Sequence, residues 1–358
     1  MTLWISTRSK PFDINIAIYY YPQSMPELRY NLLTRDWIII ATDRAKRPED
    51  FAGKPAPVAD ASAANCPFCP GREAKTPPEI FAFRDPGTQP NTPGWQVRVT
   101  RNAFPALAPE GELTKTKTPA GFFKMNGVGA HEVIIETPEH DKVIATMEQA
   151  QVDKIFLAYK ERFSSLARDP RFQSVILFKN HGRGAGTSLS HPHSQIIALP
   201  IVPDVLRNRL NTCREHTAET KCCLYCDLIK MEKSEGERII EESANFVVFV
   251  PFAARMPFEM WVMPKFHNPN FQEITTEQCL ELAAIVKKTL EKLYRAVGNP
   301  SFNYAIYSAP VKEHDVSYFH WNLKIFPRVA MAAGFEVGSG VMINTVVPEM
   351  AAKYLREA

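Results

Sequence analysis

The sequence predicts an α+β fold built from two tandem copies of one unit, each an antiparallel sheet with helices. A Cys-x-x-Cys pair opens each half of the chain, at 66–69 and at 223–226. Each half then has a strand that ends near a histidine, a long helix, and a strand before a second histidine. The two histidines lie 51 residues apart in the first half and 53 apart in the second, which indicates an internal repeat.

In the first half, an apolar run over 131–136 predicts a strand. Apolar residues spaced three and four apart over roughly 147–168 predict a helix with one buried face. A strand over 174–178 follows, and a Gly-rich loop at 182–186 leads toward another strand at 196–199. These elements provide one strand-helix-strand unit with a loop beside its last strand.

The second half repeats this order. It predicts a strand over 258–263, a helix over roughly 276–296, and strands over 304–307 and 323–326. Because the two series match, one half is expected to superimpose on the other.

The prolines Pro200 and Pro203 start the connection between the halves. They divide the chain into an N-terminal domain over 25–203 and a C-terminal domain over 204–358. Residues 1–24 resemble nothing that follows, and we interpret them as an N-terminal extension, because Met25 begins a more regular sequence.

Composition narrows the class of protein. Of 358 residues, 45% are hydrophobic and 23% charged, as in an ordinary globular protein. A net charge of +3 is too close to neutral to indicate a nucleic-acid partner. No apolar run approaches the ~20 residues that span a bilayer, and the apolar stretch 14–18 lacks a small-residue cleavage site after it. We therefore expect a cytoplasmic protein without a membrane partner.

Cysteine usage favours metal sites over disulfides, because four of the seven cysteines form two Cys-x-x-Cys pairs in a chain without a signal peptide. Each half supplies two thiolates and two imidazoles, a set that suits tetrahedral zinc. The alternative is that these are separate core or surface residues, but their repeated order argues against it. The two predicted sites are Cys66, Cys69, His140 and His191, and Cys223, Cys226, His267 and His320.

The halves differ at one position, because the first has His191-x-His193 where the second has His320-x-Asn322. Residues i and i+2 of a strand point to the same face, so His191 can bind metal while His193 projects into a cleft. A neutral imidazole attacks phosphorus when one ring nitrogen is free and the other is anchored, for example by a backbone carbonyl. Asn322 cannot act as a nucleophile, so only the first half is expected to be reactive. The alternative is a purely structural histidine.

Groups that bind phosphoryl oxygens lie near His193 in sequence. Gln195 can donate an amide hydrogen bond, and Asn180 and Ser188 border the Gly-rich loop, whose backbone amides also donate. Arg44 and Arg47 carry guanidinium forks that bind phosphate, although a solvated basic turn would have the same composition.

Four segments carry a specific pattern: residues 43–48, Cys66-Pro67-Phe68-Cys69, the 180–195 loop with its His-Pro-His-Ser-Gln run, and Gly334-Phe335-Glu336. Through them, the chain from about Met25 to the C-terminus resembles the galactose-1-phosphate uridylyltransferase family of the histidine-triad superfamily. The tail from 334 to 344 and the paired Cys-x-x-Cys plan also resemble ADP-glucose phosphorylase, a plant relative.

The resemblance implies two tandem histidine-triad-like units and a ping-pong reaction. His193 would attack the α-phosphorus of UDP-glucose, releasing glucose 1-phosphate, and galactose 1-phosphate would then attack the uridylyl-histidine. Gln195 would stabilise the phosphoryl oxygens. The chain would work as a homodimer in which the region around Glu336 contacts sugar across the interface. The substrate-binding residues implied by the family are Arg44, Arg47, Asn102, Phe104, Asn180, Gly186, Ser188, Glu336 and Asn344.

This sequence departs from the family pattern at three positions that affect which nucleotide base and which sugar are expected. Ala103 replaces an acidic residue, Ser194 replaces glycine, and Asn344 stands where a sugar-binding glutamine is expected. The alternatives are therefore an adenylyl-transferring ADP-glucose phosphorylase that uses the same histidine, a nucleotide hydrolase, and a zinc-stabilised binding module without catalysis.

Overall fold

The computed structural model describes residues 25–41, 63–313 and 315–358. The predicted extension 1–24 and the predicted phosphate ligands Arg44 and Arg47 lie outside these residues.

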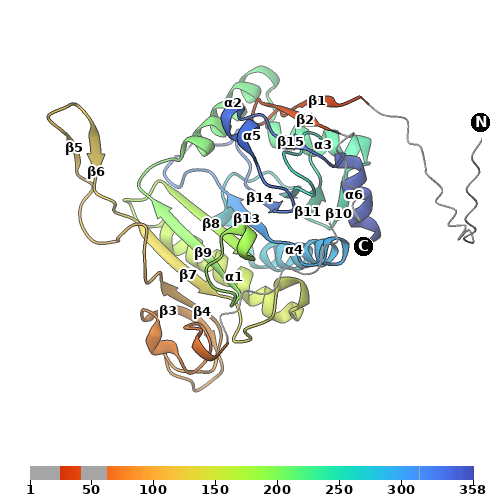
Figure 1. The fold of residues 1–358 in the computed structure, drawn as a ribbon. Coiled ribbons are helices and arrows are strands. Elements are labelled where there is room, and N and C mark those ends of the chain that lie inside the picture. The colour runs from red at the N-terminus through yellow and green to blue at the C-terminus, as the bar shows by residue number, and fades with distance from the viewer. Residues whose placement is uncertain (1–24, 42–62, 314) are drawn as a thin grey trace, which may run out of the picture.

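One ten-stranded antiparallel sheet runs through the molecule and takes five strands from each half of the chain (Figure 1). Strands β13 and β8 pair at its middle and join the two halves. In order across the sheet the strands are β10 (Ile239–Glu242), β11 (Phe246–Phe249), β12 (Met260–Pro264), β14 (Asn322–Pro327), β13 (Phe302–Tyr307), β8 (Ser174–His181), β9 (His193–Leu199), β7 (Ala130–Ile135), β4 (Trp95–Arg101) and β3 (Glu79–Arg84). The α+β class is confirmed, but the repeats share one continuous sheet instead of forming one sheet each.

The strand order repeats outward from this junction. On one side it runs β13, β14, β12, β11, β10, and on the other it runs β8, β9, β7, β4, β3. A long helix follows the third strand on each side, α1 (Gln149–Ala167) after β7 and α4 (Thr276–Val297) after β12. The core strands and both helices lie where the sequence predicts them.

Helices α1 and α4 lie against each other on one face of the sheet and bury their apolar stripes there (Figure 1). Strand residues alternate between the two faces, as the two-residue period of a strand requires. In β11, Phe246 and Val248 belong to the core under these helices, whereas Val247 and Phe249 belong to a second core on the opposite face.

The opposite face is covered differently in the two halves. Helices α2 (Asp204–Thr220) and α3 (Leu224–Glu235) bury apolar side chains against β11 and β12 in the C-terminal half. In the N-terminal half the matching face carries a smaller cluster of Trp95, Val133 and Ile135, with Phe68 packed against it. This difference in cover leaves room for a site in the N-terminal half.

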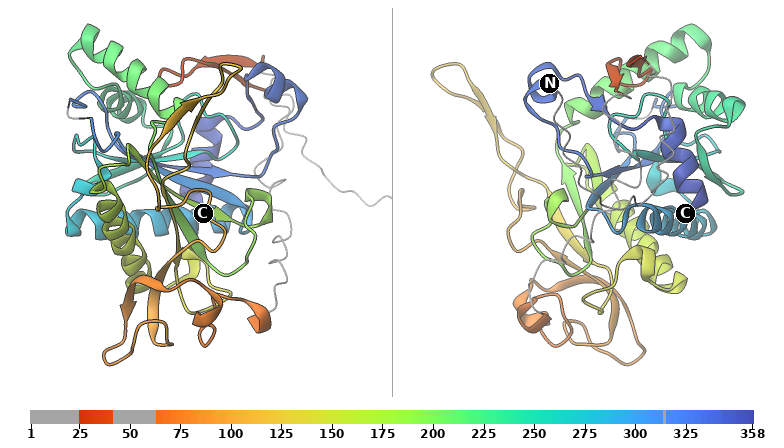
Figure 2. Two further views of the ribbon diagram at one scale, coloured as in Figure 1. Left: turned by 90° about the vertical axis from the view of Figure 1, so that its left-hand side faces the viewer. Right: turned by 45° about the vertical axis from the view of Figure 1, so that its right-hand side comes forward.

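Short elements lie outside the large sheet. Strands β1 (Glu27–Tyr30), β2 (Trp37–Ile40) and β15 (Ile343–Asn344) form a small sheet, and β5 (Lys115–Lys117) and β6 (Phe123–Met125) form a hairpin. The hairpin projects away from the body as an arm (Figures 1 and 2). Helices α5 (Gly334–Ser339) and α6 (Pro348–Glu357) lie near the C-terminus. No helix in the described residues combines the length and apolar character needed to cross a bilayer.

Candidate functional site

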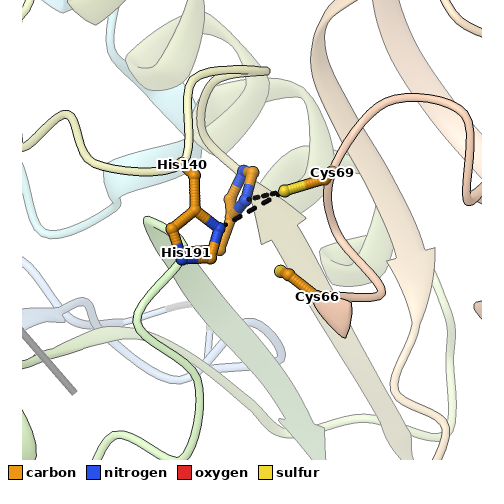
Figure 3. A group of neighbouring side chains, drawn as sticks. All are labelled: Cys66, Cys69, His140 and His191. Carbon is orange, nitrogen blue, oxygen red and sulfur yellow. Dashed lines mark hydrogen bonds between the residues drawn. The ribbon is translucent and has the colours of Figure 1, made fainter. Parts of the chain in front are cut away.

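The first predicted ligand set converges in space (Figure 3). Cys69 Sγ lies 3.3 Å from His140 Nδ1 and 3.6 Å from His191 Nδ1, and the ligand atoms of all four residues, with Cys66, lie within 4.8 Å of one another. Zn–S bonds of about 2.3 Å and Zn–N bonds of about 2.0–2.1 Å at tetrahedral angles separate sulfur from nitrogen by about 3.5–3.6 Å. The cluster therefore fits a tetrahedral metal ion.

In both imidazoles of this cluster Nδ1 faces Cys69, and a contact of Nε2 with a neighbouring oxygen orients the ring. His191 Nε2 donates to the carbonyl oxygen of Thr137 at 2.7 Å, and His140 Nε2 lies 3.0 Å from the hydroxyl of Ser190. Burial lowers the pKa of His191 to about 4, so its ring is neutral near pH 7, as a metal ligand must be. Such second partners fix the ring tautomer and direct Nδ1 toward the metal position.

The second ligand set repeats this geometry in the C-terminal half. Cys226 Sγ lies 3.4 Å from His267 Nδ1 and 3.6 Å from His320 Nδ1, and Cys223 completes the group. The two imidazoles are nearly perpendicular, at 86°, as they are at 87° in the first set. Two Cys/His clusters that can hold metal ions are thus present.

His193 begins strand β9, so His191 lies just before the strand and not within it as the sequence suggested. Nδ1–H of His193 donates to the carbonyl oxygen of His191 at 2.8 Å, which is the backbone anchor expected from the sequence. Burial lowers the pKa of His193, so the ring is neutral near pH 7. Among the described residues no hydrogen bond occupies Nε2, and this nitrogen keeps the lone pair a nucleophile needs.

A buried ion pair supports the strand behind His193. Lys179 Nζ donates to Glu136 Oε2 at 2.6 Å and to the carbonyl oxygen of His193 at 3.2 Å. The other carboxylate oxygen of Glu136 accepts from the hydroxyls of Ser194 and Tyr159. Burial opposes the ionisation of Glu136, but Lys179 and these donors outweigh it and hold its pKa below the ordinary value. No sequence pattern predicted this network.

Gln195 points to the same face as His193 and has two partners. Its Oε1 lies 2.8 Å from His131 Nε2 and 3.3 Å from Asn102 Nδ2. Phe104, two residues after Asn102, is 91% exposed and open to a ligand. The structure therefore brings Asn102 together with Gln195 and adds His131, which the sequence analysis missed.

A cavity of about 530 Å³ opens beside His193 and the first metal cluster. Its lining includes Gly182, Arg183 and Gly184 of the Gly-rich loop, Asn180 and the cluster histidines His140 and His191, but not Gly186, Ser188 or Gln195. Gly186 has a φ of 86°, a left-handed conformation that favours glycine, and Ser188 is exposed on the same loop. A cavity of this size accommodates a small-molecule ligand.

Two predicted residues lie in other surroundings. Glu336 accepts a hydrogen bond from the backbone N–H of Ala333 at 2.9 Å and caps the short helix α5. Asn344 is 1% exposed, and its amide bonds to the backbone groups of Ala254 and Val346. Within one described chain, neither residue belongs to the cluster around His193.

Family models match both halves of the chain. The model described as galactose-1-phosphate uridyl transferase, N-terminal domain, matches residues 19–203, and the C-terminal domain model matches residues 209–357. The chain belongs to the galactose-1-phosphate uridyl transferase family. This is a family of enzymes, and the resemblance noted in the sequence is confirmed.

Individual members of the uridyl transferase family align along most of the chain. An ADP-glucose phosphorylase from Arabidopsis thaliana is 37% identical over 93% of both chains. A galactose-1-phosphate uridylyltransferase from Thermotoga maritima is 30% identical, covering 93% of this chain and 98% of its own. A crystal structure of an Arabidopsis ADP-glucose phosphorylase with bound ADP-glucose has a TM-score of 0.77 and 35% identity, covering 93% of this chain and 99% of the other.

Proposed function

We propose that this enzyme transfers a nucleoside monophosphate from a nucleotide sugar to a phosphate acceptor through a covalent bond to His193. The free Nε2 of a neutral, anchored imidazole beside a cavity carries the proposal. Nε2 attacks the α-phosphorus of the donor, and the sugar 1-phosphate leaves with the electron pair of the broken P–O bond. The acceptor phosphate then attacks the nucleotidyl-histidine and regenerates the free imidazole.

The first donor and acceptor proposed are UDP-glucose and galactose 1-phosphate, the exchange that the family is named for. Gln195 donates to the phosphoryl oxygens, and Arg44, Arg47, Asn180, Gly186 and Ser188 bind phosphate. Asn102 and Phe104 lie near the base, and the exposed ring of Phe104 supports this role.

ADP-glucose is the second candidate donor, with inorganic phosphate as acceptor. The 37% identity to the plant ADP-glucose phosphorylase favours it over the 30% identity to the bacterial uridylyltransferase. The chemistry at His193 is the same, since an adenylyl group replaces the uridylyl group.

We also propose that both Cys₂His₂ clusters hold zinc, because two thiolates and two imidazoles at tetrahedral spacing prefer it. The bound metal supplies rigidity to loop-rich regions. Cys66 and Cys69 hold the loop that places Phe68 with its ring 5.4 Å from that of His193.

The proposed assembly is a homodimer of chains that each have two histidine-triad-like domains, 25–203 and 204–358. The projecting β5–β6 arm favours a homodimer, because its side chains Phe122 and Phe123 are 74% and 67% exposed and a second chain could cover them. In this assembly Glu336 belongs to the sugar site across the interface. Asn344, expected from the sequence to bind sugar, is buried and bonded through both ends of its amide to backbone groups, so it is not assigned to that site.

Labelling tests the proposal directly. The protein is incubated with UDP-glucose or ADP-glucose labelled in the α-phosphate, and the labelled peptide is identified by mass spectrometry. The true donor should label His193, and its sugar 1-phosphate should appear in equal amount. His193→Gly should abolish labelling and regain partial turnover when imidazole is added, since the cavity remains.

Two other outcomes assign different functions. Rapid release of nucleoside monophosphate without an acceptor would indicate a hydrolase. If neither donor labels the protein, and binding is unchanged in His193→Ala, the protein is a zinc-stabilised binding module.

A further inference from the structure

We propose that His131 is a positioning residue that orients the Gln195 amide so that its NH₂ group donates to the phosphoryl group under attack. The inference rests on the proposed function. His131 lies on β7, beside the strand that carries His193, and it belongs to neither metal cluster.

The tautomer of His131 follows from a backbone contact. The N–H of Ala106 donates to His131 Nδ1 at 3.1 Å. A backbone amide nitrogen only donates, so Nδ1 must be unprotonated and the ring proton must be on Nε2. Nε2–H lies 2.8 Å from Gln195 Oε1 and therefore donates to it.

Asn102 adds a second donor to the same oxygen. The backbone N–H of Phe104 donates to Asn102 Oδ1 at 2.8 Å, which fixes the side-chain amide of Asn102 with its NH₂ group outward. Asn102 Nδ2 then donates to Gln195 Oε1 at 3.3 Å. The carbonyl oxygen of Gln195 is thus occupied by two donors, and only its NH₂ group is left for substrate.

This orientation decides how Gln195 meets an anion. A flipped amide would direct its carbonyl oxygen at the negatively charged phosphoryl oxygens and remove a donor from the site. Gln195 follows His193 by two residues on β9, so both side chains point to the same face. His131 acts on this face through Gln195, because Gln195 Oε1 accepts from its Nε2–H while its Nδ1 accepts from Ala106. Asn102 Nδ2 lies 3.1 Å from His131 Nε2, but both nitrogens are donors and converge on the same oxygen of Gln195.

The experiment compares wild type, His131→Phe, Gln195→Ala and the double variant. Rapid-quench labelling with α-phosphate-labelled UDP-glucose and ADP-glucose gives the rate of His193 modification. We expect His131→Phe to slow this step about 10–100-fold with KM changed less than about threefold, because the lost donor acts mainly in the transition state. His131→Gln should restore part of the rate, since its amide can donate to Oε1.

The double variant separates positioning from a general structural effect. If His131 acts through Gln195, adding His131→Phe to Gln195→Ala should cost less than about threefold, since the partner is already absent. Fully additive losses, or a wild-type labelling rate in His131→Phe, would overturn the inference alone. A wild-type protein that is never labelled would overturn the proposed function and the inference with it.

The tautomer gives a readout independent of turnover. In ¹⁵N NMR of the wild-type protein, His131 should be protonated at Nε2 and not at Nδ1. A proton on Nδ1 would contradict the bond from Ala106 and the inference built on it.

Discussion

The two halves of the chain hold nearly identical Cys₂His₂ clusters but differ in the residue two positions after the last ligand. His193 Nδ1 donates to the carbonyl oxygen of His191, and Asn322 Nδ2 donates to the carbonyl oxygen of His320 at 3.1 Å. The same backbone anchor therefore holds an imidazole in one half and an amide in the other. On the proposed function, the Cys/His cluster is a scaffold in both halves, and reactivity depends on the side chain two residues after its last histidine.

His193 and Asn322 also differ in their surroundings. His193 lines an open cavity, whereas Asn322 is completely buried on the face that α2 and α3 cover. Next to His193, Lys179 and Ser194 belong to a buried polar network, and the matching register positions in the C-terminal half hold the apolar pair Ile306 and Leu323. Among the described residues, the N-terminal half thus combines a cavity with a buried polar network beside the anchored side chain, and the C-terminal half has apolar residues in place of that network.

The largest expected effect separates His193 from Asn322. His193→Ala should lower nucleotidyl transfer at least ~10⁴-fold, as loss of a covalent nucleophile does in other enzymes. Asn322→Ala should keep the transfer rate within about threefold and cost about 1–3 kcal/mol in stability through its lost buried hydrogen bond. Steady-state rates and urea unfolding of both variants measure these effects, and similar activity losses in the two would refute the asymmetry.

The two Cys/His clusters could be predicted from sequence because the same residue order occurs in both halves of the chain. The polar network could not, because Glu136 and Lys179 are far apart in the chain, and Glu136 directly follows one strand while Lys179 lies within another that resembles an ordinary buried strand. His131 was hidden for a similar reason, since its partner Ala106 belongs to a loop whose path only the fold defines. The cover formed by α2 was missed because many of its residues are polar and few are buried.

The second largest effect concerns the buried ion pair of Lys179 and Glu136 beside strand β9. Lys179→Met should destabilise the protein by about 3–5 kcal/mol, because it leaves the buried carboxylate of Glu136 without its cation. The matched change Ile306→Met in the C-terminal half should cost less than about 1.5 kcal/mol, since it nearly conserves volume. Urea midpoints of the two variants make the comparison, and equal losses would show that the ion pair adds nothing specific.

The pH dependence of the same pair sharpens this test. The pKa of Glu136 is held below its ordinary value, so its contribution to stability is complete above the ordinary carboxyl range. It is lost as pH falls through the lowered folded pKa. In Lys179→Met, protonation relieves the unpaired carboxylate, so the difference from wild type should shrink as the pH is lowered toward 4. A difference that stays constant with pH would contradict this assignment.

A smaller effect should distinguish the two metal clusters. His191 Nε2 donates to the carbonyl oxygen of Thr137, whereas His320 Nε2 is buried without a partner among the described residues. Loss of such a partner typically weakens metal binding about 10–100-fold, so a chelator should remove the C-terminal metal first. Metal content and transfer activity followed together should show activity persisting after the first equivalent is lost. Cys223→Ser should then keep its activity, and Cys66→Ser should lose it. If activity fell together with the first equivalent of metal, the N-terminal cluster would be the one that loses its metal first, contrary to this prediction.

The smallest effect lies in the two helices that correspond between the halves. Thr275 caps α4, where its hydroxyl accepts from the backbone N–H of Gln278 at 3.2 Å and the Gln278 side chain accepts from the N–H of Thr275 at 3.0 Å. Helix α1 begins after Glu148, whose side chain makes no capping hydrogen bond. Thr275→Ala should therefore cost about 1 kcal/mol, and Glu148→Ala should change stability by less than about 0.5 kcal/mol. Urea unfolding of the two variants measures both values. Equal values would mean that the capping box at α4 contributes no more than the uncapped start of α1.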